Sequence, residues 1–220
     1  YLDQPIGGCQ YSDITVFSFH PVKIITTAEG GLATTNDKEL LTRMQLFRSH
    51  GVTRDPELMN KETEGGWYYQ QVELGFNYRM TELQAALGVS QMKRLDEFVA
   101  LRHQRQVRYD ELLKGLPIVV PYQSLDSYSA LHLYPITIKL DEIKRTRQEV
   151  FQVLRENNIG VNIHYIPVHT QPYYKNMGFK KGDHPNAESY YESTISIPMF
   201  QGLTIEMQDE VVNILKKALI

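Results

Sequence analysis

Apolar and β-branched residues gather in short runs along the first part of the chain, as they do in strands. Residues 13–19 are rich in β-branched and aromatic side chains, which predicts a strand that ends near Pro21. Residues 24–27 and 32–35 form two more short apolar runs, and the turn at 28–31 between them contains two adjacent glycines. We therefore expect a hairpin to follow the first strand.

After residue 36, the apolar residues recur with the period of about 3.6 residues that is typical of a helix. Asn36 or Asp37 can cap a helix whose apolar residues recur at helical spacing, and Gly51 is placed to end it. The next segment, residues 52–77, is glycine-rich, aromatic and aperiodic. Such a segment is typical of a loop that carries binding groups.

A long helix is predicted next. Thr81 and Gln84 match a capping box, and the helical stripe continues to about Leu113. Because a helix of this length usually bridges two parts of a structure, we place a domain boundary within it, between residues 1–105 and 106–220.

The second half has the pattern of a small α+β domain. Strands are expected at residues 118–121, 133–140 and 161–165, an amphipathic helix at 142–156, and a last helix from about 204 to 219.

Composition narrows the class of protein. With 42% hydrophobic and 22% charged residues, the chain has the make-up of a soluble globular protein. Its 23 Lys+Arg and 26 Asp+Glu give a net charge of −3, which argues against a nucleic-acid binder. No apolar run approaches the roughly 18 residues of a membrane helix, and no signal peptide is recognisable. Cys9 is the only cysteine, so no internal disulfide can form and a cytoplasmic location is expected.

Lys23 is the strongest candidate for chemistry. It follows Ser18 and His20 where the first predicted strand ends, and ligands of α/β proteins bind at strand ends. Its apolar neighbours would partly desolvate the amine, which would make it a better nucleophile and base. The simpler alternative is a surface lysine whose stem lies along apolar neighbours. The residues by themselves leave both open.

Other kinds of site have no matching pattern. The seven histidines include no H-x-x-x-H pair, and one cysteine cannot build a zinc site, so no metal is expected. Neither a dinucleotide-binding glycine loop nor a P-loop is present.

Two long motifs carry a resemblance to a known family. The runs FSFHPVKIITTAEGG, residues 17–31, and GFNYRMTELQAAL, residues 75–87, resemble two segments of the DegT/DnrJ/EryC1/StrS sugar aminotransferases, in the family's order and separation. The later runs IHYIPVHTQPYY, residues 163–174, and SIPMFQGLT, residues 196–204, are similar to its C-terminal domain. The resemblance covers nearly the whole chain.

The resemblance implies an α/β fold of the PLP-dependent transferase type (aspartate aminotransferase type), represented by the later part of its large domain and a small α+β C-terminal domain. It makes Lys23 the lysine that forms a Schiff base with pyridoxal 5'-phosphate (PLP) and then moves a proton at the substrate carbon. Ser18 would help to hold the cofactor phosphate, and Asn77 would reach the cofactor phosphate of the neighbouring subunit in a homodimer. His164 and Tyr165 would line the nucleotide-sugar pocket. Without the resemblance, Ser18 is an ordinary strand residue, Asn77 a turn residue and His164 a structural histidine.

Within the family, the chain is most similar to the C4 aminotransferases of the pseudaminic-acid pathway. This similarity implies a UDP-linked 4-keto-6-deoxy-N-acetylhexosamine as substrate and L-glutamate as amino donor. Lys23 favours transamination over the dehydratase branch, which has histidine at this position. The alternatives are a C3 aminotransferase, a dehydratase, and a non-catalytic or truncated homologue that acts as a binding or dimerisation module.

Two features depart from the family pattern. The family's aspartate at the pyridine nitrogen and the aromatic residue on the cofactor ring have no counterpart in these 220 residues. We therefore expect the chain to be the later part of such an enzyme, with Tyr1 at an interior position. Ala28 stands where glycine is expected, and a positive φ there would cost alanine about 1 kcal/mol.

Overall fold

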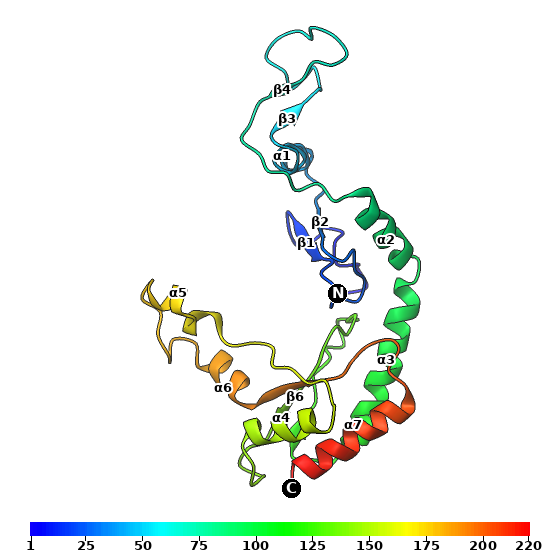
Figure 1. The fold of residues 1–220 in the computed structure, drawn as a ribbon, viewed down its shortest axis with the longest axis vertical. Coiled ribbons are helices and arrows are strands. Elements are labelled where there is room, and N and C mark those ends of the chain that lie inside the picture. The colour runs from blue at the N-terminus through cyan, green and yellow to red at the C-terminus, as the bar shows by residue number, and fades with distance from the viewer. The chain divides into compact units, whose positions relative to one another are not determined.

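A computed structural model describes all 220 residues of the chain, which divide into two compact units, Tyr1–Leu95 and Asp96–Ile220 (Figure 1). The boundary lies at the start of a helix, ten residues before the predicted position 105. The reason is that Phe98 and Arg102, which precede residue 105, are both buried in the second unit. No helix in the structure combines the length and the apolar character that a membrane span needs.

The first unit begins with an antiparallel hairpin of β1 (Thr15–Ser18) and β2 (Gly31–Thr34), in which Thr15 lies opposite Thr34. This pairing corrects the prediction, because residues 24–27 form no strand. Residues 19–30 are instead a loop, which closes when the Phe19 N–H donates to the Gly30 carbonyl over 2.9 Å. The prediction failed because the first strand itself pairs with β2, so the run at 24–27 has no strand left to pair with.

The rest of the first unit follows the predicted order. Helix α1 (Lys38–Arg48) is capped by Asp37, whose Oδ1 accepts hydrogen bonds from two backbone N–H groups of the first turn. A loop with the short strands β3 (Val52–Thr53) and β4 (Gln70–Gln71) comes next. Helix α2 (Glu82–Met92) then begins with the predicted capping box. A helix N-terminus needs such partners for its free N–H groups, which explains why both starts could be predicted.

The predicted long helix is two helices, α2 and α3 (Leu95–Leu112), separated by a turn at Lys93 and Arg94. No proline or glycine marks this break. Asp96 and Glu97 stand in the first turn of α3, where negative charge interacts favourably with the helix dipole. These acidic residues favour a new helix start.

The second unit is built on an antiparallel sheet with the strand order β5 (Ile118–Val119), β6 (Tyr134–Ile138), β7 (Thr194–Ile197). The remaining helices of the unit are α4 (Arg147–Glu156), the 3₁₀ helix η1 (Val168–Thr170), α5 (Pro172–Lys175), α6 (Pro185–Ser193) and α7 (Ile205–Ala218). The buried core is formed by apolar side chains of α3, the sheet, α4 and α7, among them Tyr109, Ile136, Leu154, Ile195 and Leu215. Every residue of β7 is buried, because β6 and a bridge from Asn162 to Ser196 flank it. The predicted strand at 161–165 is reduced to this bridge.

A buried arginine, Arg102, binds two connecting segments of the second unit, one before β6 and one after β7. Its Nη1 donates to the carbonyl oxygens of Leu131, His132 and Met199 over 3.0, 3.2 and 2.9 Å, and its Nη2 donates to the Gln201 side chain over 3.2 Å. Only 3% of Arg102 is exposed, and this burial lowers the pKa of its guanidinium. The partners all come from segments next to β6 and β7, so Arg102 joins these segments to α3.

The two units differ in how they bury apolar residues. No apolar side chain of residues 1–95 is fully buried, and Val16 and Leu83 remain 75% and 86% exposed. The buried apolar residues all belong to the second unit. The first unit is therefore held mainly by backbone hydrogen bonds and close glycine contacts.

Ala28 has φ 66°, which lies in the left-handed region where glycine would carry no strain. We expect Ala28→Gly to raise the free energy of unfolding by up to about 1 kcal/mol, because glycine relieves the left-handed strain that alanine carries. Chemical denaturation measures the change. Ala33→Gly is the matched control: Ala33 lies within β2, and glycine there is expected to lower stability by about 0.5–1 kcal/mol. Equal effects of the two substitutions would contradict the strain argument.

Candidate cofactor and substrate site

Ser18 and Lys23 lie on one continuous segment at the end of β1. Ser18 is the last residue of the strand, and its Oγ lies 3.4 Å from the His20 N–H that donates to it. The chain then turns, because the Lys23 N–H donates to the His20 carbonyl over 2.9 Å. Across the loop, His20 Nε2 lies 3.8 Å from a carboxylate oxygen of Glu29. The turn thus keeps the hydroxyl and the amine in one local structure.

The side chain of Lys23 is available for chemistry. The residue is half-buried, and its amine forms no hydrogen bond or ion pair anywhere in the chain. A primary amine can form a covalent bond with the aldehyde of PLP, and a serine hydroxyl can donate to a phosphate oxygen. The donor set at this strand end therefore fits the cofactor that the sequence motifs imply.

Asn77 belongs to the same unit as Lys23 but to a different segment. It is exposed, and its backbone pairs with Ser49 in an isolated antiparallel bridge. The neighbouring Tyr78 N–H donates to the Arg48 carbonyl over 3.0 Å, which fixes the strand-like segment before α2 to the end of α1. Asn77 thus presents its side chain from a well-defined backbone.

His164 and Tyr165 belong to the second unit. His164 Nδ1 lies 2.8 Å from the Oγ of Ser196, a buried residue of β7, and its ring packs edge-on against Tyr165 at 4.6 Å between centroids. Tyr165 itself is 66% exposed. The pair therefore combines an anchored imidazole with a tyrosine that can contact a ligand.

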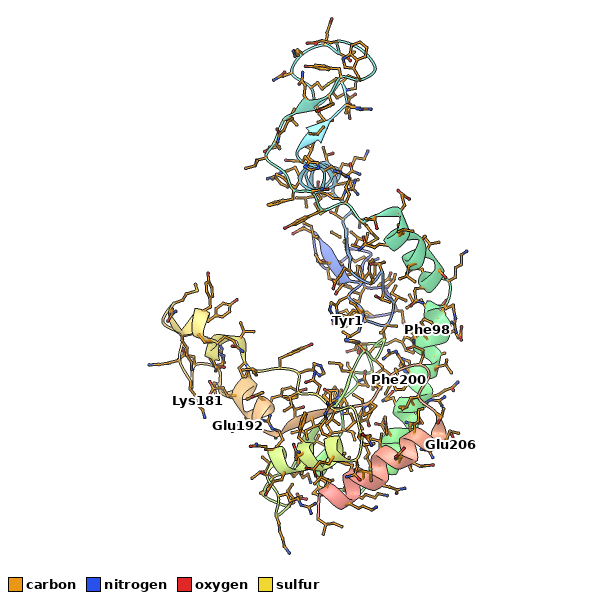
Figure 2. All side chains as sticks on the ribbon, viewed as in Figure 1. Tyr1, Phe98, Lys181, Glu192, Phe200 and Glu206 are labelled. Atoms are coloured by element: carbon orange, nitrogen blue, oxygen red, sulfur yellow. The ribbon has the colours of Figure 1, made fainter.

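Residues 163–193 form an excursion, a segment that leaves the core of the second unit and contains η1, α5 and α6. The sequence pattern did not predict α5 and α6. A buried pair holds the excursion: His169 Nε2 donates to Glu188 over 2.7 Å, and the Gly182 N–H donates to the same carboxylate over 2.7 Å. These hydrogen bonds, the one from His169 first, lower the pKa of Glu188. On the outside of the same excursion, Lys181 and Glu192 form an exposed ion pair at 3.4 Å (Figure 2).

A sequence signal for the two missed helices does exist. Pro172 and Pro185 occupy the first positions of α5 and α6, where a proline without an N–H is favourable. No sequence pattern predicts the buried hydrogen bond between His169 and Glu188, because the two residues are far apart in the sequence and only the fold brings them together.

Comparison with known proteins gives a consistent result. The model of the DegT/DnrJ/EryC1/StrS aminotransferase family matches residues 1–216. A UDP-4-amino-4,6-dideoxy-N-acetyl-β-L-altrosamine transaminase from Campylobacter jejuni is 32% identical over 222 residues, which cover 99% of this chain and 56% of the relative. The chain spans about half the length of the curated relatives that it matches.

Solved structures resemble the whole chain. Helicobacter pylori PseC, described as an aminotransferase involved in the biosynthesis of pseudoaminic acid, matches with a TM-score of 0.88 and 30% identity, over 100% of this chain and 56% of PseC. Spr1654 from Streptococcus pneumoniae, solved in its PLP form, matches with a TM-score of 0.85 and 30% identity, over 100% of this chain and 55% of Spr1654. The fold is thus that of the PLP-dependent sugar aminotransferases, and because the family model matches nearly the full chain, this chain belongs to the DegT/DnrJ/EryC1/StrS aminotransferase family.

Proposed function

We propose that this chain provides the lysine-bearing part of a PLP-dependent aminotransferase that acts on a nucleotide-linked 4-keto-6-deoxy sugar. The observation that carries the proposal is the unpartnered, half-buried amine of Lys23 at the end of β1, within a chain that belongs to an aminotransferase family. The family uses PLP, and relatives include one solved in a PLP form.

Each proposed residue has a separate task. When bound, PLP would supply an electron sink that allows the carbon of the amino donor to lose a proton and the keto carbon of the sugar to gain one. Lys23 would hold the cofactor covalently and, once released, would move these protons as a general base and acid. Ser18 donates a hydrogen bond to the cofactor phosphate, and Asn77 reaches the phosphate of the cofactor in a second subunit. A homodimer with shared sites follows from the role of Asn77.

The substrate class is proposed from the second unit and from the relatives. Tyr165 offers an exposed ring and hydroxyl, and His164 an imidazole anchored on Ser196, which together suit a ligand with sugar hydroxyls. Relatives named as UDP-sugar transaminases support a UDP-linked sugar, and the amino donor that we propose is L-glutamate.

The proposal is tested by incubating the purified protein with PLP, reducing it with borohydride and mapping the product by mass spectrometry. We expect one pyridoxyl group on Lys23. The exposed Lys38 of α1 is the internal control and should stay unmodified at stoichiometric PLP. Labelling spread evenly over surface lysines would reject Lys23 as the cofactor lysine.

A non-catalytic binding or dimerisation module is the alternative of a different class. It predicts binding of a nucleotide sugar with no reduction product at Lys23 and no amino group transferred from L-glutamate. Product analysis by NMR then separates the C4 transaminase from a C3 transaminase or a dehydratase, because the three products carry different substituents at C3 and C4 of the sugar.

A further inference from the structure

A second polar surface of the first unit is lined by residues of the β3–β4 hairpin and of the segments that follow α1 and precede α2. It is a depression of about 820 Å³ whose lining includes Ser49, His50, Thr53, Arg54, Tyr69 and Arg79. Two guanidinium groups and an imidazole thus line one depression, and no carboxylate lines it. We call this surface the arginine pocket.

The arginines of the pocket have no counter-charge in contact with them within this chain. Arg54 and Arg79 are exposed, and their side chains form no hydrogen bond or ion pair in the chain. By contrast, Arg108 of α3 forms an ion pair of 2.7 Å with Asp209. Gathered cations without a counter-charge create a positive potential that attracts an anion.

Hydrogen bonds and a close glycine contact define the backbone of the pocket. His50 has φ 62° and Gly51 has φ 69°, so two successive residues adopt the left-handed conformation. The His50 N–H donates to the Phe76 carbonyl over 2.8 Å. The His50 carbonyl accepts a hydrogen bond from Gln71 Nε2 over 3.0 Å. A Cβ at Gly51 would collide with the backbone of Glu73. Left-handed conformations of non-glycine residues are concentrated at functional sites, and His50 is such a residue.

The chemistry of the lining selects the kind of anion. An arginine guanidinium presents a planar fork that binds two phosphate oxygens at once, and two such forks suit a group with two phosphates. The free hydroxyls of Ser49 and Tyr69 add donors. The pocket also lies next to Asn77. The backbone of Asn77 pairs with that of Ser49, which lines the pocket, and Asn77 precedes Arg79 by two residues.

We infer that the arginine pocket binds the diphosphate of the nucleotide-linked substrate, with Arg54 and Arg79 as its main ligands. The identity of the ligand rests on the proposed function, whereas the preference for a diphosphate rests on the pocket itself. The single phosphate of the cofactor is assigned to Ser18 and Asn77, which lie outside the lining.

The test measures binding of UDP to the purified protein by isothermal titration calorimetry. Arg54→Gln and Arg79→Gln are each expected to raise the Kd for UDP about tenfold or more, because each removes a charge-assisted contact to phosphate. The control is Arg43→Gln, which removes the same charge from an exposed position of α1 outside the lining and is expected to leave the Kd within about twofold. Uridine, which has no phosphate, should bind equally to all variants.

Two outcomes would overturn the inference. In the first, Arg54→Gln and Arg79→Gln bind UDP as tightly as the unmodified protein. In the second, they lose PLP while their affinity for UDP is unchanged, which would assign the pocket to the cofactor phosphate. Borohydride labelling of Lys23 is measured on the same samples. Arginine-dependent binding of UDP without that label would reject the proposed function and retain the pocket.

Discussion

Replacing Lys23 by alanine is expected to lower the rate of transamination by at least about 10³-fold. In the proposed mechanism, the substitution removes both the covalent attachment of the cofactor and the group that moves the protons. The side chain makes no hydrogen bond or ion pair, so its loss should leave the fold unchanged. The assay follows formation of the amino sugar from the 4-keto sugar nucleotide and L-glutamate, and circular dichroism verifies the fold.

Lys38→Ala is the matched control, because Lys38 is an exposed lysine of α1 in the same unit. It should retain the full rate. A Lys23→Ala protein that also retains the full rate would refute the proposed mechanism. Added small amines would partly restore the activity of Lys23→Ala if the missing function is proton transfer, which distinguishes chemistry from misfolding.

The largest expected effect on stability comes from Arg102→Met, which we expect to lower the free energy of unfolding by about 3–5 kcal/mol. The substitution keeps an apolar stem of similar length but removes the donors for the carbonyls of Leu131, His132 and Met199. Buried acceptors without donors cost about 1–3 kcal/mol each. Urea denaturation followed by far-ultraviolet circular dichroism measures the loss.

Arg155→Met tests whether this loss is specific. Arg155 is an exposed arginine in the last turn of α4, and its replacement should change stability by no more than about 0.5 kcal/mol. Arg102→Lys should fall between the two, because an ammonium group keeps the charge but cannot reach all of the acceptors. Equal stability of Arg102→Met and Arg155→Met would contradict the role of Arg102.

Much of the fold could be predicted where local chemistry determines an element. The capping residues Asp37, Thr81 and Thr204 each begin a helix in the structure, because their side chains bind the free N–H groups of the first turn. Pairing between strands was less predictable, as the misplaced strand at residues 24–27 shows.

The candidate site also has a part that the sequence predicts and a part that only the fold brings together. The motif around Lys23 is contiguous in sequence, so Ser18 and Lys23 can be proposed as site residues from the sequence alone. The sequence could not identify Arg54 and Arg79 as one site, because they are far apart in sequence: Arg54 follows β3, and Arg79 lies just before α2. Only the close packing of the segments around Gly51 brings them to the same depression.

The sequence by itself determined the family and the helix starts at Asp37 and Thr81, and it singled out Lys23 as the candidate for the chemistry. Each of these depends on neighbouring residues, whose interactions act over a few positions of the chain. The tertiary structure alone decided that β1 pairs with β2, that Arg102 binds three distant carbonyls, and that two unpaired arginines line one pocket. These features join residues far apart in sequence, and they form only because backbone hydrogen bonds and packing hold the distant segments together.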